Sequence, residues 1–547
     1  MTNKISIIIL SLFLILCNAN VIGQTDSSLI DYNVTHYNLA IDFDLNQKSF
    51  NGNVEVTADI LQTTNEFTLH ASNATLTIDS VFSSQDKLNF QHKSDLLTIS
   101  LSSIFNPLSS FKLKIFYHGI SDFKGNFEEG GIYFSADDKA ATSSEPSFAR
   151  KWFPCKDVPS DKATANISIT VPGNLKAIST GLLKSIDHKN GMATYNWETK
   201  YPIATYLISV AVAPYKEFSE NYKSISGKEM EIYYYVFPED SIKARTDFIN
   251  TTKILSFFEQ IFGEYPFIDE KFGFAEVDGE MTMENQTIPS IQQNMFTGDR
   301  QYELTLAHET AHQWFGNLIT PVDWKHTWLN EGFATYAEAL YLEHRKGKEA
   351  YQKYINSMMS MPEGTYITPV AGRSDTAFWD SFSPSQYYKG AIVLHMLRRM
   401  VGDSIFFEII RSYISNPLLK YSNVKTEDFI QTCETISHKK LDWFFDQWIY
   451  RLPDSLDRPV LEYSWATIKS DSSFNTLVTL HQSNSTTPPY FLPFDIVLKM
   501  DSIKTTFSVI DSLKSQSFRL PSKFNPAQVL IDPEQNIFKT LRRRESN

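Results

Sequence analysis

The hydrophobic pattern changes its period twice along this chain, and this change constrains the fold more than any other feature. Over residues 31–217 apolar and polar residues alternate, for example at 37–43 and 111–117, which is typical of half-buried β-strands. From about residue 221 apolar residues recur at helical spacing instead, and past Pro459 the alternation returns. The pattern predicts a multidomain α+β protein with an all-β domain, a mostly helical domain and a small C-terminal β-sandwich.

The 547 residues are too many for one core, because domains typically contain about 100–200 residues. We therefore place an N-terminal β-domain at 24–218, a helical domain at 219–455 and the β-sandwich at 456–547. The helical segments that we expect are 248–262, 301–315, 328–343, 390–401, 405–414, 426–437 and 441–450.

The start of the chain has the pattern of a secretory signal. Lys4 precedes an almost unbroken apolar run over 5–17, and small or apolar residues at 21–23 fit a cleavage site before Gln24. We predict a signal peptide at 1–23 and a protein exported to the periplasm or the cell exterior. The alternative is an uncleaved N-terminal anchor. We expect no membrane span after cleavage, because no other apolar stretch is long enough.

Charge and cysteine content narrow the class of protein further. The net charge of −13 argues against a nucleic-acid partner, which would require a basic surface. After signal cleavage only Cys155 and Cys433 remain, and two distant cysteines do not make a disulfide framework. We expect both to be buried free thiols. The sequence leaves the oligomeric state open.

Two histidines four residues apart, His308 and His312, provide the strongest chemical signal. On a helix this spacing places both imidazoles on one face, so they can bind a single metal ion. A catalytic zinc site needs a third protein ligand and an open position for water. Glu331, which follows His312 by 19 residues in a second amphipathic segment, is the candidate. Glu338, two turns further along that segment, is a candidate hydrogen-bond partner for a ligand histidine, the alternative being an acid in solvent.

This ligand set predicts one Zn²⁺ ion per chain. Two imidazoles and a carboxylate also suit non-heme iron, but a helical histidine pair with a glutamate between its members favours zinc. Zn²⁺ lowers the pKa of a bound water and polarises a carbonyl group. Glu309, between the two histidines, is placed to accept the proton of that water and to pass it to a leaving amine.

Three blocks of sequence resemble the gluzincin aminopeptidase family, which includes aminopeptidase N and the leukotriene hydrolase. The segments 308–317 and 328–334 resemble its zinc signature, 281–285 (Met-Thr-Met-Glu-Asn) resembles its exopeptidase motif, and 387–391 resembles the block with its catalytic tyrosine. Weaker matches lie at 149–155 and 444–448. The resemblance extends from Tyr37 to about Trp448, most of the mature chain.

The resemblance implies a zinc aminopeptidase that acts on peptides with a free N-terminus. It assigns Glu284 to the substrate's α-ammonium, and a carboxylate is suitable chemistry for that group. It assigns Tyr387 to oxyanion stabilisation, with Tyr388 as the nearest rival. It also implies a thermolysin-like catalytic domain, an immunoglobulin-like C-terminal domain and the short three-domain form of the family, whose site would be more open to longer peptides.

This sequence departs from the family pattern near the substrate amine. Met281 and Thr282 replace glycine and alanine of the exopeptidase motif, which would reshape the pocket for the first residue. Glu145 stands where many members carry glutamine, so a second carboxylate would contact the amine and favour basic first residues.

Three other functions remain to be compared with the aminopeptidase. An endopeptidase with a similar zinc site would cleave N-terminally blocked peptides. A non-catalytic peptide-binding relative is disfavoured, because Glu309 and Tyr387 are both present. An epoxide hydrolase is disfavoured by the stretch 313–315 and by the shortness of the C-terminal region.

Overall fold

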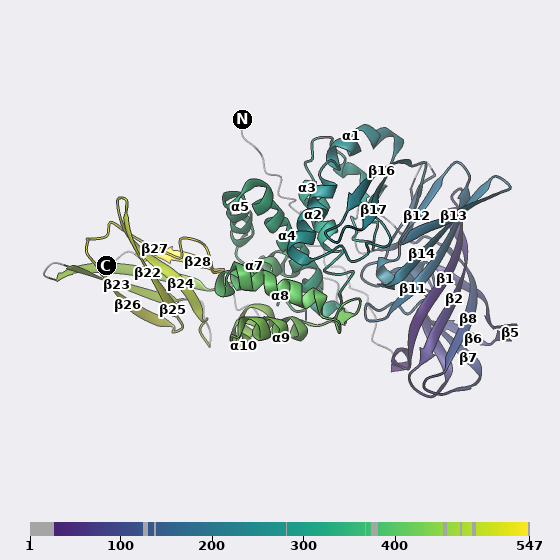
Figure 1. Ribbon diagram of the computed structural model, residues 1–547. Coiled ribbons are helices and arrows are strands. Elements are labelled where there is room, and N and C mark those ends of the chain that lie inside the picture. The colour runs from purple at the N-terminus through teal and green to yellow at the C-terminus, as the bar shows by residue number, and fades with distance from the viewer. Residues whose placement is uncertain are drawn as a thin grey trace.

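The computed structural model describes residues 27–123, 129–135, 138–279, 282–366, 368–372, 381–451, 457–470, 473–483 and 488–544. The predicted signal peptide 1–23 and Met281 lie outside them. The N-terminal sheets occupy one end of the molecule, the helices lie in the middle and the C-terminal strands form the other end (Figure 1). The protein is therefore mixed α+β, with a β-rich N-terminal domain and a helical region after it.

The N-terminal region is built on an eight-stranded sheet in the order β13-β14-β11-β1-β2-β8-β4-β5. Its strands are antiparallel except for the parallel pair of β1 and β11. In β8 buried and exposed residues alternate without exception, which explains the period-two sequence pattern. The strands are β1 (Tyr32–Asp44), β2 (Ser49–Ile60), β4 (Leu76–Ser83), β5 (Asp86–Leu88), β8 (Ser110–Ile120), β11 (Lys162–Pro172), β13 (Leu182–Lys189) and β14 (Met192–Ala204).

Two smaller sheets complete this region, in the orders β3-β7-β6 and β12-β15-β10-β9. A hydrophobic core shared by these sheets contains the buried thiol of Cys155. Their strands are β3 (Thr64–His70), β6 (Phe90–Lys93), β7 (Leu96–Phe105), β9 (Gly131–Phe134), β10 (Ala140–Ser143), β12 (Lys176–Ser179) and β15 (Val210–Ala213).

The middle of the molecule begins with a four-stranded mixed sheet in the order β16-β17-β18-β19. Helices follow, and a short parallel pair, β20 with β21, lies among them. The strands are β16 (Lys216–Lys223), β17 (Glu229–Val236), β18 (Phe272–Val277), β19 (Ser290–Gln292), β20 (Thr320–Pro321) and β21 (Asn423–Val424). The helices are α1 (Ser241–Asp247), α2 (Thr251–Phe262), α3 (Glu303–Ala311), α4 (Trp328–Lys346), α5 (Lys348–Met359), α7 (Gly390–Val401), α8 (Asp403–Ser415), α9 (Thr426–Ser437) and α10 (Asp442–Phe445).

The C-terminal region contains a four-stranded sheet, β26-β23-β22-β28, and a three-stranded sheet, β25-β24-β27. One hydrophobic core runs from the helices into both sheets and includes the buried thiol of Cys433. The strands are β22 (Val460–Ser470), β23 (Ser473–Gln482), β24 (Leu492–Met500), β25 (Ile503–Asp511), β26 (Ser515–Ser522), β27 (Gln528–Ile531) and β28 (Thr540–Arg543). Within the described residues, no helix combines the length and the apolar character needed to cross a bilayer.

Candidate active site

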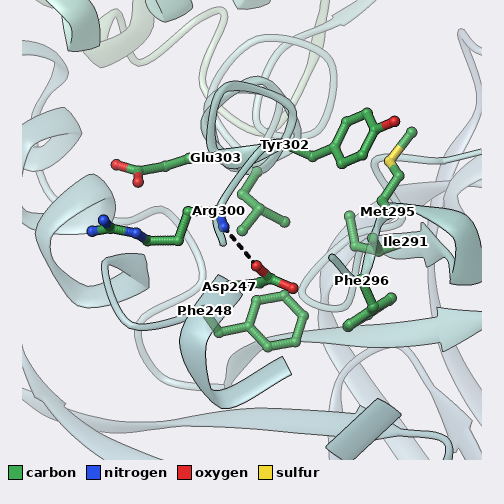
Figure 2. Close-up of a pocket in the computed structure, with 9 residues that line it drawn as sticks. Asp247, Phe248, Ile291, Met295, Phe296, Arg300, Tyr302 and Glu303 are labelled. Carbon is green, nitrogen blue, oxygen red and sulfur yellow. Dashed lines mark hydrogen bonds between the residues drawn. The ribbon is translucent and has the colours of Figure 1, made fainter. Parts of the chain in front are cut away.

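Helix α3 contains His308 and ends directly before His312, and hydrogen bonds hold the turn that precedes it. The Asp247 carboxylate accepts hydrogen bonds from the amides of Gly298 and Arg300, at 2.9 and 2.8 Å, in the turn before α3. Figure 2 shows the bond from Arg300. These contacts line a small hollow that contains none of the predicted site residues. The hollow is therefore separate from the candidate site.

Helices α3 and α4 run antiparallel. Near the start of α3, Glu303 accepts a 2.6 Å hydrogen bond from the hydroxyl of Tyr341, which lies late in α4. Beyond the other end of α3, Gly316 lies against the side chain of Asn330 early in α4. This arrangement brings Glu331 and Glu338 of α4 alongside His308 of α3.

The three predicted metal ligands converge on one point. The Nε2 atoms of His308 and His312 lie 3.3 and 3.4 Å from the same carboxylate oxygen, Oε2 of Glu331. Two imidazole nitrogens and one carboxylate oxygen lie within 4.8 Å of one another, so a single ion can meet all three. This donor set fits zinc, which binds imidazole and carboxylate ligands at about 2.0–2.2 Å.

In both imidazoles the Nδ1 atom makes a hydrogen bond that orients the ring. His308 Nδ1 lies 2.9 Å from the Glu338 carboxylate, which also accepts a 2.6 Å hydrogen bond from the Tyr354 hydroxyl. His312 Nδ1 lies 2.9 Å from the backbone carbonyl of Phe315. Hydrogen bonds of this kind fix the tautomer and leave Nε2 free for a metal. The predicted contact between Glu338 and a ligand histidine is present in the structure.

The electrostatics of this cluster favour a bound cation. Burial alone would raise the pKa of Glu331, but His312 and His308 lower it to about 2. Burial would likewise lower the pKa of His312, but Glu331 and Glu284 raise it to about 9. The carboxylates thus stabilise positive charge at the imidazoles, and a divalent ion would supply that charge directly.

Three further carboxylates surround the ligands. Glu309, Glu284 and Glu145 are all buried, and burial raises the pKa of each, for Glu309 to about 7. One oxygen of Glu284 and one of Glu145 have no hydrogen-bond partner in the structure. Carboxylate oxygens of Glu145, Glu284 and Glu331 also lie within 4.8 Å of one another. Buried polar oxygens without a partner are costly, so the carboxyls of Glu284 and Glu145 can gain from a proton or from a cationic group.

Tyr387 lies in the short π-helix η7 (Ser385–Lys389), directly before α7. Its ring stacks parallel to that of His308 with 6.4 Å between the ring centres, which places it beside the ligand cluster. Burial and then the Glu331 carboxylate raise the pKa of Tyr387 well above its usual value, so the hydroxyl keeps its proton. Tyr388, the rival position, packs against the hydrophobic core.

The backbone of Glu284 is held by two residues that the sequence analysis did not select. Its carbonyl accepts hydrogen bonds from the side-chain amides of Asn317 and Gln313, at 2.8 and 3.3 Å. Both amides are fully buried. Gln313 follows His312 directly, but nothing in the sequence pattern indicates that its side chain reaches the segment 282–285. Thr282 of that segment donates a 3.4 Å hydrogen bond to the sulfur of Met295.

Comparisons with known proteins identify the family of this chain. The model of the peptidase family M1 domain matches residues 247–448, and that of the peptidase M1 N-terminal domain matches 33–207. Together the two models span more than half of the chain. The chain therefore belongs to peptidase family M1, the zinc aminopeptidase family that its motifs resemble.

Known relatives differ from this chain in length. Glutamyl aminopeptidase of Sus scrofa is 27% identical over 487 residues, which are 82% of this chain and 50% of the relative. Aminopeptidase M1 of Arabidopsis thaliana is 27% identical over 448 residues, 75% of this chain and 49% of the relative. The chain thus spans about half the length of the curated relatives it matches.

Two solved structures confirm the fold alone, because their sequence identity is low. An M1 zinc metallopeptidase from Deinococcus radiodurans has a TM-score of 0.67 at 23% identity, covering 77% of this chain and 95% of its own. Aminopeptidase A of Legionella pneumophila, in complex with aspartic acid, has a TM-score of 0.79 at 19% identity, covering 94% of this chain and 60% of its own.

Proposed function

We propose that this protein is a zinc-dependent aminopeptidase that hydrolyses the N-terminal peptide bond of peptides. The observation that carries the proposal is the position of Glu284, whose buried and unpartnered carboxylate oxygen lies next to the ligand cluster. If the first peptide bond of a substrate lay at the cluster, the substrate's free α-ammonium would reach Glu284. A substrate with a blocked N-terminus would leave that carboxylate buried without a counter-charge.

His308, His312 and Glu331 would hold one Zn²⁺ ion, with Glu338 fixing the imidazole of His308. When bound, the ion would polarise the scissile carbonyl and make a water molecule acidic enough to attack at neutral pH. Glu309 accepts the proton from the attacking water and passes it to the leaving amine, a transfer for which a pKa near 7 is well matched.

Tyr387 would stabilise the reaction's developing negative charge. Its hydroxyl stays protonated at neutral pH and can donate a hydrogen bond to the tetrahedral oxyanion. Glu145 would contact the α-ammonium together with Glu284. Two carboxylates around the amine would also favour basic first residues, because a second positive charge gains from the same field.

A panel of aminoacyl chromogenic substrates tests the proposal, with each substrate assayed in the presence and absence of a chelator. We expect release that the chelator abolishes and added Zn²⁺ restores. Glu284→Ala should abolish release while one zinc per chain remains bound. Absence of chelator-sensitive release from every substrate would rule out the proposal, and cleavage of N-terminally blocked peptides would identify an endopeptidase instead.

We also propose that the molecule divides at 24–218, 219–455 and 456–547, with the last part an immunoglobulin-like β-sandwich. Its two sheets of four and three strands support this architecture. Limited proteolysis followed by mass spectrometry tests the boundaries. Fragments that end far from residues 218 and 455 would contradict them.

We propose further that the protein is exported to the periplasm or the cell exterior. The apolar run at 5–17 after Lys4 and the small residues at 21–23 support this proposal. N-terminal sequencing of the protein recovered from cell fractions should begin at Gln24. A protein that retains Met1 would contradict the predicted cleavage.

A further inference from the structure

The turn that follows Glu284 contains a residue in an unfavourable backbone conformation. Thr287 has a φ of +67°, in the left-handed region that glycine or asparagine usually occupies. It is the third residue of a turn closed by a 3.1 Å hydrogen bond from the Ile288 amide to the Asn285 carbonyl. A β-branched residue is strained here, so the surrounding contacts must hold it in place.

The hydroxyl of Thr287 ties this turn to the N-terminal β-domain. It accepts hydrogen bonds from the backbone amide of Gly181, at 3.0 Å, and from the ammonium of Lys271, at 3.2 Å. Lys271 is buried, and its ammonium also donates to the carbonyls of Ser179 and Gly181. All three donors of the ammonium are therefore used, two on the N-terminal domain and one on Thr287.

The backbone of Thr287 ties the same turn to the helix with the histidine pair. Its amide donates a 2.9 Å hydrogen bond to the side-chain oxygen of Gln313, next to His312. The nitrogen of that same Gln313 side chain donates to the carbonyl of Glu284. One glutamine thus spans the turn from Thr287 back to Glu284 and anchors both beside the ligand cluster.

We propose that Thr287 is a positioning residue for Glu284, which it fixes relative to the ligand cluster by joining Lys271 and Gly181 on one side to Gln313 on the other. Thr287 has no carboxylate or imidazole and does not act on substrate itself. Its effect on catalysis passes through the place of the Glu284 carboxylate. The inference rests on the proposed aminopeptidase function and names a determinant of its amine binding.

A matched pair of variants tests the inference. Thr287→Val keeps the size, the β-branching and the backbone amide but removes the hydroxyl, whereas Thr287→Ser keeps the hydroxyl. We expect Thr287→Val to raise KM about tenfold and to weaken inhibition by the free product amino acid equally, with kcat and zinc content close to wild type, because only amine binding is disturbed. Thr287→Ser should keep KM and the inhibition by the product amino acid close to wild type.

A control and a second variant make the outcome decisive. Lys228→Met removes an exposed ion pair with Asp269 near Lys271 and should leave KM unchanged. If Thr287→Val fails to fold, Gln313→Met removes the hydrogen bonds from the Gln313 side chain to Thr287 and Glu284 and should raise KM in the same way. An inactive wild type would refute the proposed function. An active wild type with an unchanged KM in folded Thr287→Val or Gln313→Met would refute the inference alone.

Discussion

At the scale of single residues, the candidate site depends on which atoms are already engaged. Each ligand histidine uses Nδ1 in a hydrogen bond and presents Nε2 to Glu331. Glu284 and Glu145, in contrast, each keep a carboxylate oxygen without a partner. The protein thus supplies a hydrogen-bond partner behind each imidazole and leaves two buried carboxyl oxygens beside them without one.

Tyr387 provides the sharpest residue-scale prediction. Tyr387→Phe keeps the ring that stacks on His308 but removes the oxyanion donor, so we expect kcat to fall about 10²–10³-fold with little change in KM or zinc content. Steady-state kinetics on an aminoacyl chromogenic substrate measure this loss. Tyr388→Phe is the matched control and should lose less than threefold. A large loss in Tyr388→Phe alone would move the role by one residue.

Sequence reasoning located the site residues whose spacing or motif carries a signal. His308 and His312 were predicted from helical spacing and Glu331 as the third ligand in the next amphipathic segment, and their side chains do converge. Glu284 and Tyr387 were predicted only through resemblance, because a lone glutamate or tyrosine has no local pattern. Residues that hold these groups were not predicted. Lys271, Thr287 and Gln313, among them, meet only after distant segments fold together.

At the scale of elements, helix α4 and the start of α7 meet through two glycines. A Cβ added at Gly332 would lie 3.0 Å from the Cα of Gly390 and 3.1 Å from the carbonyl oxygen of Gln386. Gly332 follows Glu331, and Gly390 comes shortly after Tyr387. The close backbone contact therefore sets the distance between the ligand helix and the segment of the predicted oxyanion donor.

Gly332→Ala should disrupt this contact, because the atoms that the new methyl group meets are backbone atoms that cannot rotate away. Overpacking costs about 1–3 kcal/mol, which exceeds the gain of roughly 1 kcal/mol from alanine in a helix. We expect a melting temperature several degrees lower and a kcat reduced at least tenfold. Lys353→Ala, on the exposed face of α5, is the control. Wild-type stability and kcat in Gly332→Ala would contradict this role.

The predicted helices differ from the observed ones at particular ends and segments. Most expected helical segments are present, but α3 ends at Ala311 and not at residue 315, because the Asn317 amide turns back to the His312 carbonyl at 3.0 Å. Gly316, with a φ of +124°, permits that turn. Helices α1 and α5 were missed. In α5 the buried Tyr351, Ile355, Met358 and Met359 do recur at helical spacing, so the sequence carried the signal for this helix.

At the scale of the whole molecule, the N-terminal β-domain takes part in building the site and does not simply cap it. Glu145 comes from this domain. Lys162, the first residue of β11, donates hydrogen bonds of 2.9 and 3.0 Å to the carbonyls of Asn317 and Leu318, just beyond α3. The change in periodicity predicted a β-rich N-terminal domain followed by helices, which the structure has. The contacts between these two parts were not predictable, because they use backbone carbonyls that every residue has.

Lys162 makes the stability of this domain contact depend on pH. Burial among neutral carbonyls lowers its pKa to about 7, against 10.5 for an exposed lysine. Between these values the unfolded chain binds a proton that the folded protein lacks, so the free energy of unfolding should rise with pH in this window. Below about pH 7 the lysine is protonated in both the folded and the unfolded state, so it does not make the free energy of unfolding depend on pH there.

Comparison with Lys162→Met isolates this effect. The variant leaves two carbonyls without a donor, which lowers its free energy of unfolding by an amount that does not depend on pH. The measurement that matters is therefore how the difference in the free energy of unfolding between wild type and variant changes with pH. From pH 7 to 9.5 wild type should gain about 3 kcal/mol relative to the variant, at 1.36 kcal/mol per pKa unit. Urea unfolding followed by tryptophan fluorescence at several pH values measures it. The exposed Lys216→Met should show no such change, and parallel pH profiles of wild type and Lys162→Met would refute the prediction.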